Sequence, residues 1–171
     1  MPPASNITRP ITDRAKQSLF DILTPQLDDS IVYDCFAGTG SMGLECLSRG
    51  ALHALFFESD REALCGLRSN IRTLNVADRS GVIGGDLFRW FDDPGHRGQA
   101  TLVFLDPPYR FLHERSDDLK TLASNLAARH LADHATVIFR HDAEDSLELS
   151  PLKPVDRRKY GGMSIEMLRL S

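Results

Sequence analysis

Short runs of apolar, β-branched and aromatic residues recur along this chain at a spacing that leaves room for a helix between successive runs. The runs occupy residues 31–36, 54–58, 81–85, 101–105 and 135–140, and helical patterns occupy 41–49, 61–74 and 114–130. Such runs suit parallel strands that are covered on both faces. Their alternation with helices predicts an α/β protein with a doubly wound, mostly parallel, Rossmann-like sheet. In such a sheet, ligands bind beyond the carboxyl ends of the strands.

The two ends of the chain depart from this alternation. Thr12 can cap a helix whose apolar residues share one face and which stops before Pro25. After the fifth run, segments 153–159 and 163–170 are joined by Tyr160-Gly161-Gly162, which predicts an antiparallel hairpin. We therefore expect a seven-stranded sheet with an N-terminal helix and a C-terminal hairpin. A single domain would cover residues 1–171, with residues 1–30 as a cap segment and helix.

The composition narrows the class of protein. With 171 residues, 42% hydrophobic and 26% charged, the chain fits one globular domain. No apolar run approaches the roughly 18 residues of a membrane span, and the first ten residues lack the pattern of a signal peptide. The three cysteines form no C-x-x-C pair, so no disulfide framework or thiolate zinc site is indicated. We expect a cytoplasmic, monomeric protein that contacts no membrane. Its net charge of -4 argues against a protein that coats nucleic acid through a general positive field, but it still allows a local basic patch.

A glycine-rich loop follows the first predicted strand and opens a helix. Residues 34–43 read DCFAGTGSMG, and their G-x-G-x-x-G spacing lets a backbone approach a ligand closely. Glu58 ends the second strand 20 residues after Gly38, where an acid can bind both hydroxyls of a ribose. Asp86 follows the third strand, where it could hold an adenine amino group. The candidate cofactor-binding residues are Asp34, Phe36, Ala37, Gly38, Thr39, Gly40, Glu58, Ser59, Asp86, Leu87 and Asp106.

Nicotinamide dinucleotides and S-adenosyl-L-methionine both use a glycine turn and a ribose-binding acid. A dinucleotide needs a neutral first turn, so that the helix N-terminus can accept its pyrophosphate. The carboxylate of Asp34, just before that turn, would repel the anion but attract the ammonium group of a methionine moiety. The residues therefore favour S-adenosyl-L-methionine as the cofactor.

The fourth predicted strand ends in the sequence Asp106-Pro107-Pro108-Tyr109, which we take as the candidate catalytic group. The amino group of a nucleobase is a poor nucleophile, because its lone pair is delocalised into the ring. The Asp106 carboxylate can accept one N–H of such an amine and the Pro107 carbonyl the other, which favours attack on a methyl group. Two prolines stiffen the turn, and Tyr109 offers a face on which the base can stack. Whether Asp106 also takes the proton that the amine finally loses is left open by the sequence.

Other chemistries find few candidate residues. His130 and His134 are spaced i, i+4 but straddle the predicted end of a helix and lack the glutamate of a zinc motif, so no metal is expected. The sequence contains no G-x-S-x-G elbow and no P-loop lysine. Serine hydrolysis and phosphoryl transfer are therefore not indicated.

With these residues in place, the chain resembles the class I S-adenosylmethionine-dependent methyltransferases, and most closely the RsmD family. The similarity rests on residues 9–14 (RPITDR), residues 34–51 (DCFAGTGSMGLECLSRGA), Glu58, Asp86 and residues 106–109 (DPPY). The resemblance implies methylation of the exocyclic N2 of a guanine in small-subunit (16S) ribosomal RNA. It further implies that catalysis occurs around residues 106–109. The residues it implies at the cofactor or along the RNA path are Arg9, Thr12, Arg14 and Arg110.

The expected activity is therefore transfer of a methyl group to an exocyclic base amine, with ribosomal RNA or a small-subunit assembly particle as the partner. A DNA or RNA amino-methyltransferase acting on adenine or cytosine is one alternative. A catalytically silent module that binds the cofactor or RNA is the other.

Overall fold

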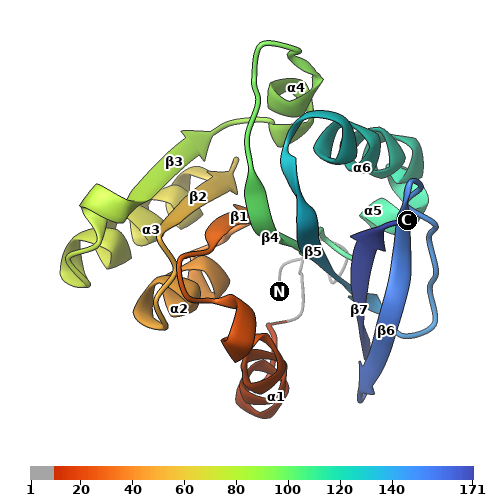
Figure 1. Cartoon of the computed structure of the whole chain (residues 1–171), viewed down its shortest axis with the longest axis horizontal. Helices are drawn as coiled ribbons and strands as arrows, with labels where there is room; N and C mark the ends of the chain where they lie inside the picture. The colour runs from red at the N-terminus through yellow and green to blue at the C-terminus, as the bar shows by residue number, and fades with distance from the viewer. Residues whose placement is uncertain (1–9) are drawn as a thin grey trace.

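The strands of this protein form one sheet in the computed structural model, which describes residues 10–171 (Figure 1). The strand order is β3-β2-β1-β4-β5-β7-β6. Strands β3, β2, β1, β4 and β5 are parallel, whereas β7 is antiparallel to both β5 and β6. The predicted doubly wound sheet with a C-terminal hairpin is thus confirmed. The strands are β1 (Ile31–Cys35), β2 (His53–Glu58), β3 (Ser80–Gly84), β4 (Ala100–Leu105), β5 (Leu131–Asp142), β6 (Leu152–Tyr160) and β7 (Met163–Leu170).

The helices cover both faces of the sheet, and the sheet separates the apolar core into two parts. Apolar residues of α1, α2 and α3 pack on one face, and those of α4, α5 and α6 pack on the other. Alternate residues of one strand supply the two cores: in β4, Phe104 belongs to the first and Val103 to the second. The helices are α1 (Asp13–Leu23), α2 (Ser41–Ser48), α3 (Arg61–Thr73), α4 (Leu87–Asp92), α5 (Phe111–Glu114) and α6 (Ser116–Arg129), with short 3-10 turns at Thr24–Gln26 and Ala77–Arg79.

The structure differs from the sequence prediction in three elements. Helix α4 was not predicted, because its six residues are too few to show a helical period. The predicted helix over 114–130 is confirmed as α6, but the short helix α5 that precedes it was not predicted; a non-helical backbone at Arg115 (φ -134, ψ 36) separates the two. Strand β5 begins at Leu131 and not near 135, because its pairing with β4 shifts register there. Asp133 and His134 are exposed in this irregular stretch, which hides the strand pattern.

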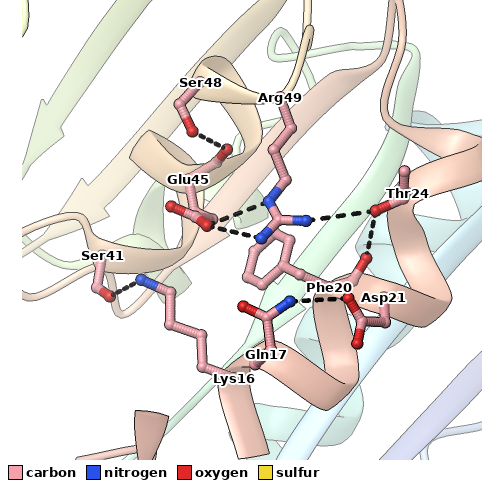
Figure 2. Close-up of polar contacts among 9 residues, drawn as sticks. All are labelled: Lys16, Gln17, Phe20, Asp21, Thr24, Ser41, Glu45, Ser48 and Arg49. Carbon is pink, nitrogen blue, oxygen red and sulfur yellow. Dashed lines mark hydrogen bonds and ion pairs between the residues drawn. The ribbon is translucent and has the colours of Figure 1, made fainter. Parts of the chain in front are cut away.

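Polar contacts join helix α1 to helix α2 on the first face of the sheet (Figure 2). Near its start, Lys16 Nζ donates to Ser41 Oγ (2.9 Å), the first residue of α2. Near the end of α1, the Phe20 ring lies under Arg49, the residue that follows α2; the guanidinium carbon is 5.1 Å from the ring centroid. Arg49 also pairs with Glu45 of α2 (3.0 Å). These contacts position the N-terminal helix against the helix that follows the glycine loop.

A hydrogen bond also joins α1 to the C-terminal hairpin, since Ser18 Oγ and Tyr160 Oη lie 2.8 Å apart.

Among residues 10–171, no helix is both long and apolar enough to cross a membrane.

Candidate functional site

A cleft of about 690 Å³ opens at the carboxyl ends of the parallel strands. It lies where strand order reverses: β1 is flanked by β2 on one side and β4 on the other. Ligands bind at this point in doubly wound sheets. Every predicted cofactor-binding residue lines the cleft except Gly40, which is buried beneath it. The lining residues are Pro10, Ile11, Asp34, Phe36, Ala37, Gly38, Thr39, Ser41, Met42, Phe57, Glu58, Ser59, Asp60, Gly85, Asp86, Leu87, Phe88, Asp106, Pro108, Arg110, Phe111, Arg115 and Arg140.

The glycine loop is shaped by an unusual backbone and by one close approach. Phe36 adopts a positive φ of 62°, which is uncommon for a residue with a side chain and often marks a functional site. Gly38 follows with a φ of 58°. A Cβ on Gly43 would lie 2.4 Å from the Phe56 ring, so only glycine lets α2 pack this closely on β2. The start of α2 is thereby held against the strand ends.

Asp34 is a buried acid at the end of β1, with an exposed fraction of 2%. Its Oδ2 accepts a hydrogen bond from the backbone N–H of Gly43 (2.9 Å). Burial, with smaller contributions from the nearby Asp106 and Glu58 charges, raises the pKa of Asp34 to about 8. A positively charged ligand bound in the cleft would therefore lower the pKa of Asp34 and favour its ionised form.

Glu58 reaches from the end of β2 to the glycine loop. Its Oε1 accepts from the backbone N–H of Gly38 (2.7 Å), and its Oε2 accepts from those of Ser59 (2.8 Å) and Asp60 (2.9 Å). These three bonds fix the carboxylate in one orientation at the rim of the cleft. Each carboxylate oxygen has more than one lone pair, so further acceptor capacity remains for ligand hydroxyls.

Asp86 and Leu87 lie where β3 passes into α4. Asp86 is exposed and caps the helix, because its Oδ1 accepts from the backbone N–H of Phe88 (2.9 Å). Leu87 is buried at the first position of the helix. Both residues face the cleft, and Asp86 combines a structural cap with a carboxylate that a ligand can reach.

The candidate catalytic residues divide into two pairs. Asp106 and Pro108 line the cleft, whereas Pro107 is buried and Tyr109 is half-buried, and neither of the latter is among the described lining residues. The Pro108 carbonyl accepts from the backbone N–H of Phe111 (2.9 Å), so the turn leads directly into α5. The structure thus brings the predicted acid to the glycine loop but does not place Tyr109 in the cleft wall.

Arg140, two residues before the end of β5, was not predicted from the sequence, although it contacts the candidate catalytic residue Asp106. Its Nε lies 2.7 Å from Asp106 Oδ1 and its Nη2 lies 2.5 Å from Oδ2. Burial raises the pKa of Asp106, and the charge and hydrogen bonds of Arg140 oppose that rise. An arginine closing the apolar run over 135–140 was the available signal, since parallel neighbours end at the same edge.

A mixed aromatic and basic wall, formed by Phe88, Phe111, Arg110 and Arg115, was also missed except for Arg110. The Arg115 guanidinium carbon lies 4.2 Å from the centroid of the Phe88 ring and 5.2 Å from that of Phe111. Arg110 pairs with Glu114 (2.9 Å). Guanidinium planes over aromatic rings suit both bases and phosphates. The cleft therefore has an acidic floor and a cationic wall.

The N-terminal candidates are not part of the described cleft wall. Arg9 lies outside the described residues, and Arg14 is exposed on α1. Thr12 is the N-cap of α1, where its side chain accepts from the backbone N–H of Ala15 (3.2 Å). The cleft is bounded on this side by Pro10 and Ile11 instead.

Replacing Thr12 with alanine should therefore lower stability. Loss of the N-cap acceptor is expected to reduce the free energy of unfolding by about 1 kcal/mol. Urea denaturation would measure the change, and Thr12→Ser should restore most of it. Equal stability of the alanine variant and the parent would contradict the capping role.

The histidine pair considered in the sequence analysis is divided between two environments. His130 is fully buried with its Nδ1 3.3 Å from Tyr33 Oη, and burial lowers its pKa to about 4. His134 is exposed on β5. Within the described part of the chain, no group of three or more histidine, cysteine, aspartate or glutamate residues is arranged to hold a metal ion.

Comparison with known proteins places this architecture in a family. The family model described as Conserved hypothetical protein 95 matches residues 1–169. Ribosomal RNA small subunit methyltransferase D of Escherichia coli K12 is 34% identical over 163 residues, which cover 94% of this chain and 78% of that protein. Bacillus subtilis "Putative rRNA methyltransferase YlbH" is 34% identical over 149 residues, which cover 84% of this chain and 77% of that protein.

A solved structure agrees with these relatives. "Putative methyltransferase yhhF from Escherichia coli" has a TM-score of 0.82 and 29% identity, and the match covers 95% of this chain and 87% of that one. The architecture, the cleft at the strand ends and the near-complete match of the family model lead to one conclusion. This protein belongs to the RsmD family, that of the ribosomal RNA small subunit methyltransferases D.

Proposed function

We propose that this protein uses S-adenosyl-L-methionine to methylate the exocyclic N2 of a guanine in small-subunit ribosomal RNA. The observation that carries the proposal is the position of Asp106, which faces the same cleft as the glycine loop and Glu58. An acid for the reacting amine thus lies beside residues suited to a nucleoside. The names of the relatives from E. coli and B. subtilis support RNA as the substrate class.

The residues of the cleft suit this cofactor. At Gly38 and Gly85, which line the cleft, a Cβ would meet nothing within 4 Å, so there is open space for a ligand against the backbone. Glu58 would accept the ribose hydroxyls, and the buried Asp34 would balance a positive charge. S-adenosyl-L-methionine supplies a methyl group on a sulfonium sulfur when bound, which requires no metal.

The chain's own residues would orient the nucleophile. Asp106 would accept one N–H of the amine, which concentrates the lone pair on nitrogen. That lone pair forms the new N–C bond as the methyl–sulfur bond breaks and its electrons remain on sulfur. The aminium that results is strongly acidic, and it loses one proton to Asp106 or to water. Positioning supplies most of the rate enhancement.

The target guanine would have to leave its stack to reach Asp106, at a cost of a few kcal/mol. A base in an accessible RNA loop, or in a small-subunit particle during assembly, requires less unstacking. Arg110 and Arg115 at the cleft wall would contact the phosphates or bases that flank it. We further propose that residues 1–171 act as one monomeric methyltransferase domain in the cytoplasm, where ribosomal subunits assemble.

Methyl transfer to defined substrates tests this proposal. The protein is incubated with S-adenosyl-L-methionine carrying a labelled methyl group and with small-subunit particles, naked ribosomal RNA or duplex DNA, and the nucleosides are then separated. Labelled N2-methylguanosine is expected. Label on adenine or cytosine would instead identify another amino-methyltransferase. No label despite tight cofactor binding would indicate a silent binding module.

Replacing Glu58 with alanine should weaken cofactor binding. The variant loses both the proposed ribose contacts and the hydrogen bond to the Gly38 N–H. The Kd for S-adenosyl-L-homocysteine should therefore rise by about 10-fold or more, which corresponds to the loss of roughly one or two hydrogen bonds to a charged group. Calorimetric titration measures this. A fall in kcat with an unchanged Kd would contradict the assignment of Glu58 to the ribose.

A further inference from the structure

Arg140 is an arginine with only 6% of its surface exposed, yet it reaches the cleft that holds the candidate acid. β4 and β5 are parallel neighbours, and Leu105 pairs with Phe139, so Asp106 and Arg140 follow at the next step of the register. Two atoms of the guanidinium contact the two carboxylate oxygens, Nε to Oδ1 at 2.7 Å and Nη2 to Oδ2 at 2.5 Å. The third nitrogen, Nη1, lies 3.4 Å from Met163 Sδ on β7.

This two-point contact fixes more than a distance. A bidentate guanidinium is coplanar with its carboxylate, so it sets the plane of the Asp106 side chain as well as its position. Each carboxylate oxygen has a second lone pair that the guanidinium leaves unused. Because Asp106 itself lines the cleft, the plane set by Arg140 decides where those lone pairs point.

The Arg140 guanidinium also affects the charge balance around Asp106. Asp34 of β1 is close enough for the charge of Asp106 to act on it. Glu58 of β2 shares the cleft, and Arg110 and Arg115 line its other wall. Among the described residues, Arg140 is the cation that contacts the Asp106 carboxylate directly, and its charge offsets those of the nearby acids.

We propose that Arg140 is a positioning residue for methyl transfer, which holds the Asp106 carboxylate ionised and in the plane needed to accept the N–H of the substrate amine. The proposal rests on the proposed function, because it assigns Asp106 to the reacting amine. Arg140 does not touch the substrate in this scheme. It acts through Asp106 alone, and the geometry of a near-attack complex depends on small displacements of such a group.

The kinetic test compares Arg140→Gln and Arg140→Lys with the parent protein. Arg140→Gln should lower kcat by about 10²-fold, as expected for a misplaced polar group, with the Kd for S-adenosyl-L-homocysteine changed less than about threefold. The acid limb of the pH–rate profile should move to higher pH, because loss of the cation raises the pKa of Asp106 and the carboxylate is then protonated earlier as pH falls. Arg140→Lys should return the acid limb towards that of the parent but recover only part of kcat, since an ammonium cannot set the carboxylate plane.

A matched control separates positioning from folding. Arg49→Gln breaks an arginine–glutamate pair on the same protein outside the cleft, and it should leave kcat unchanged. Circular dichroism and thermal unfolding would verify that each variant is folded at the assay temperature. If Arg140→Gln is folded and keeps the kcat and pH profile of the parent, the proposal is overturned. It is also overturned if kcat falls only in proportion to the unfolded fraction.

A measurement without catalysis keeps this proposal distinct from the proposed function. The ¹³C resonance of the Asp106 carboxyl carbon, assigned by its loss in Asp106→Asn, is titrated in the parent and in Arg140→Gln. An upward shift of its pKa in the variant is required, and an unchanged titration would refute the role of Arg140. If the parent itself transfers no methyl group to any nucleic acid, the proposed function fails, while the carboxyl titration still decides whether Arg140 controls Asp106.

Discussion

Asp106→Asn is expected to lower the rate of methyl transfer by about 10²–10³-fold, the effect of removing one preorganised polar group from a reacting centre. The carboxamide has nearly the same shape but lacks the negative charge that accepts the N–H and stabilises positive charge on nitrogen. It also presents an NH₂ group towards the amine or towards Arg140. The Kd for S-adenosyl-L-homocysteine should change by no more than a few-fold, because Glu58 and the glycine loop remain intact.

Single-turnover methyl transfer and calorimetric titration measure these two quantities separately. Asp106→Ala should abolish transfer as well, but it leaves the nearly buried Arg140 without the carboxylate that it contacts, which costs about 3–5 kcal/mol of stability when a buried pair is broken. The asparagine variant is therefore the cleaner test. Equal losses of transfer and of cofactor affinity would contradict the assignment of Asp106 to the amine.

Asp34→Asn is expected to stabilise the protein without cofactor above pH 8 and to weaken cofactor binding by more than 10-fold, because the balancing charge for the ammonium group is lost. The pKa of Asp34 is about 8 in the folded protein because the group is buried, whereas its ordinary value is 3.8. A folded-state pKa above the unfolded one contributes stability that is fully present below about pH 4 and is lost as pH rises through 8. The asparagine side chain remains neutral and can still accept from the Gly43 N–H.

Urea denaturation from pH 5 to pH 9 would measure this difference. The free energies of unfolding of the variant and the parent should diverge as pH rises, by several kcal/mol at pH 9 and by at most about 6 kcal/mol, given the size of the shift. Asp28→Asn, which removes an exposed carboxylate, is the control and should show no such divergence. A stability difference between Asp34→Asn and the parent that does not vary with pH would show that Asp34 is not a buried, protonated acid. Asp34 therefore lowers the stability of the cofactor-free protein at high pH while providing a charge needed in binding.

Local sequence patterns were enough to predict the sheet and most of the cleft. Apolar runs of the right length identified the strands, and the topology then placed Asp34, Glu58 and Asp106 at one edge. The glycine spacing identified the loop because Gly38 requires a positive φ and Gly43 a close approach to Phe56. In each case, a short-range rule fixed the position of the residue.

What the sequence did not predict depends on contacts between distant segments. Arg140 and Asp106 are 34 residues apart and meet only because β5 lies beside β4. The depth of Asp34 follows from packing on both faces of β1 and could not be read from its neighbours in sequence. Tyr109 was assigned to the cleft from its motif, but the path of the chain into α5 decides which side chains reach the wall.

The strand order also has a consequence for how the chain folds as it is synthesised. β1 is made early but lies between β2 and β4, and its pairing of Asp34 with Phe104 joins residues that are far apart in sequence. Parallel pairings of this kind form slowly, because a long loop must close before any contact is made. The cleft is lined by residues as far apart in the sequence as Asp34 and Arg140. Most of the chain must therefore leave the ribosome before the site can form. Until then the backbone N–H and C=O groups on the β4 side of β1 have no strand partner, and such an unpaired edge exposes the growing chain to aggregation and to capture by chaperones.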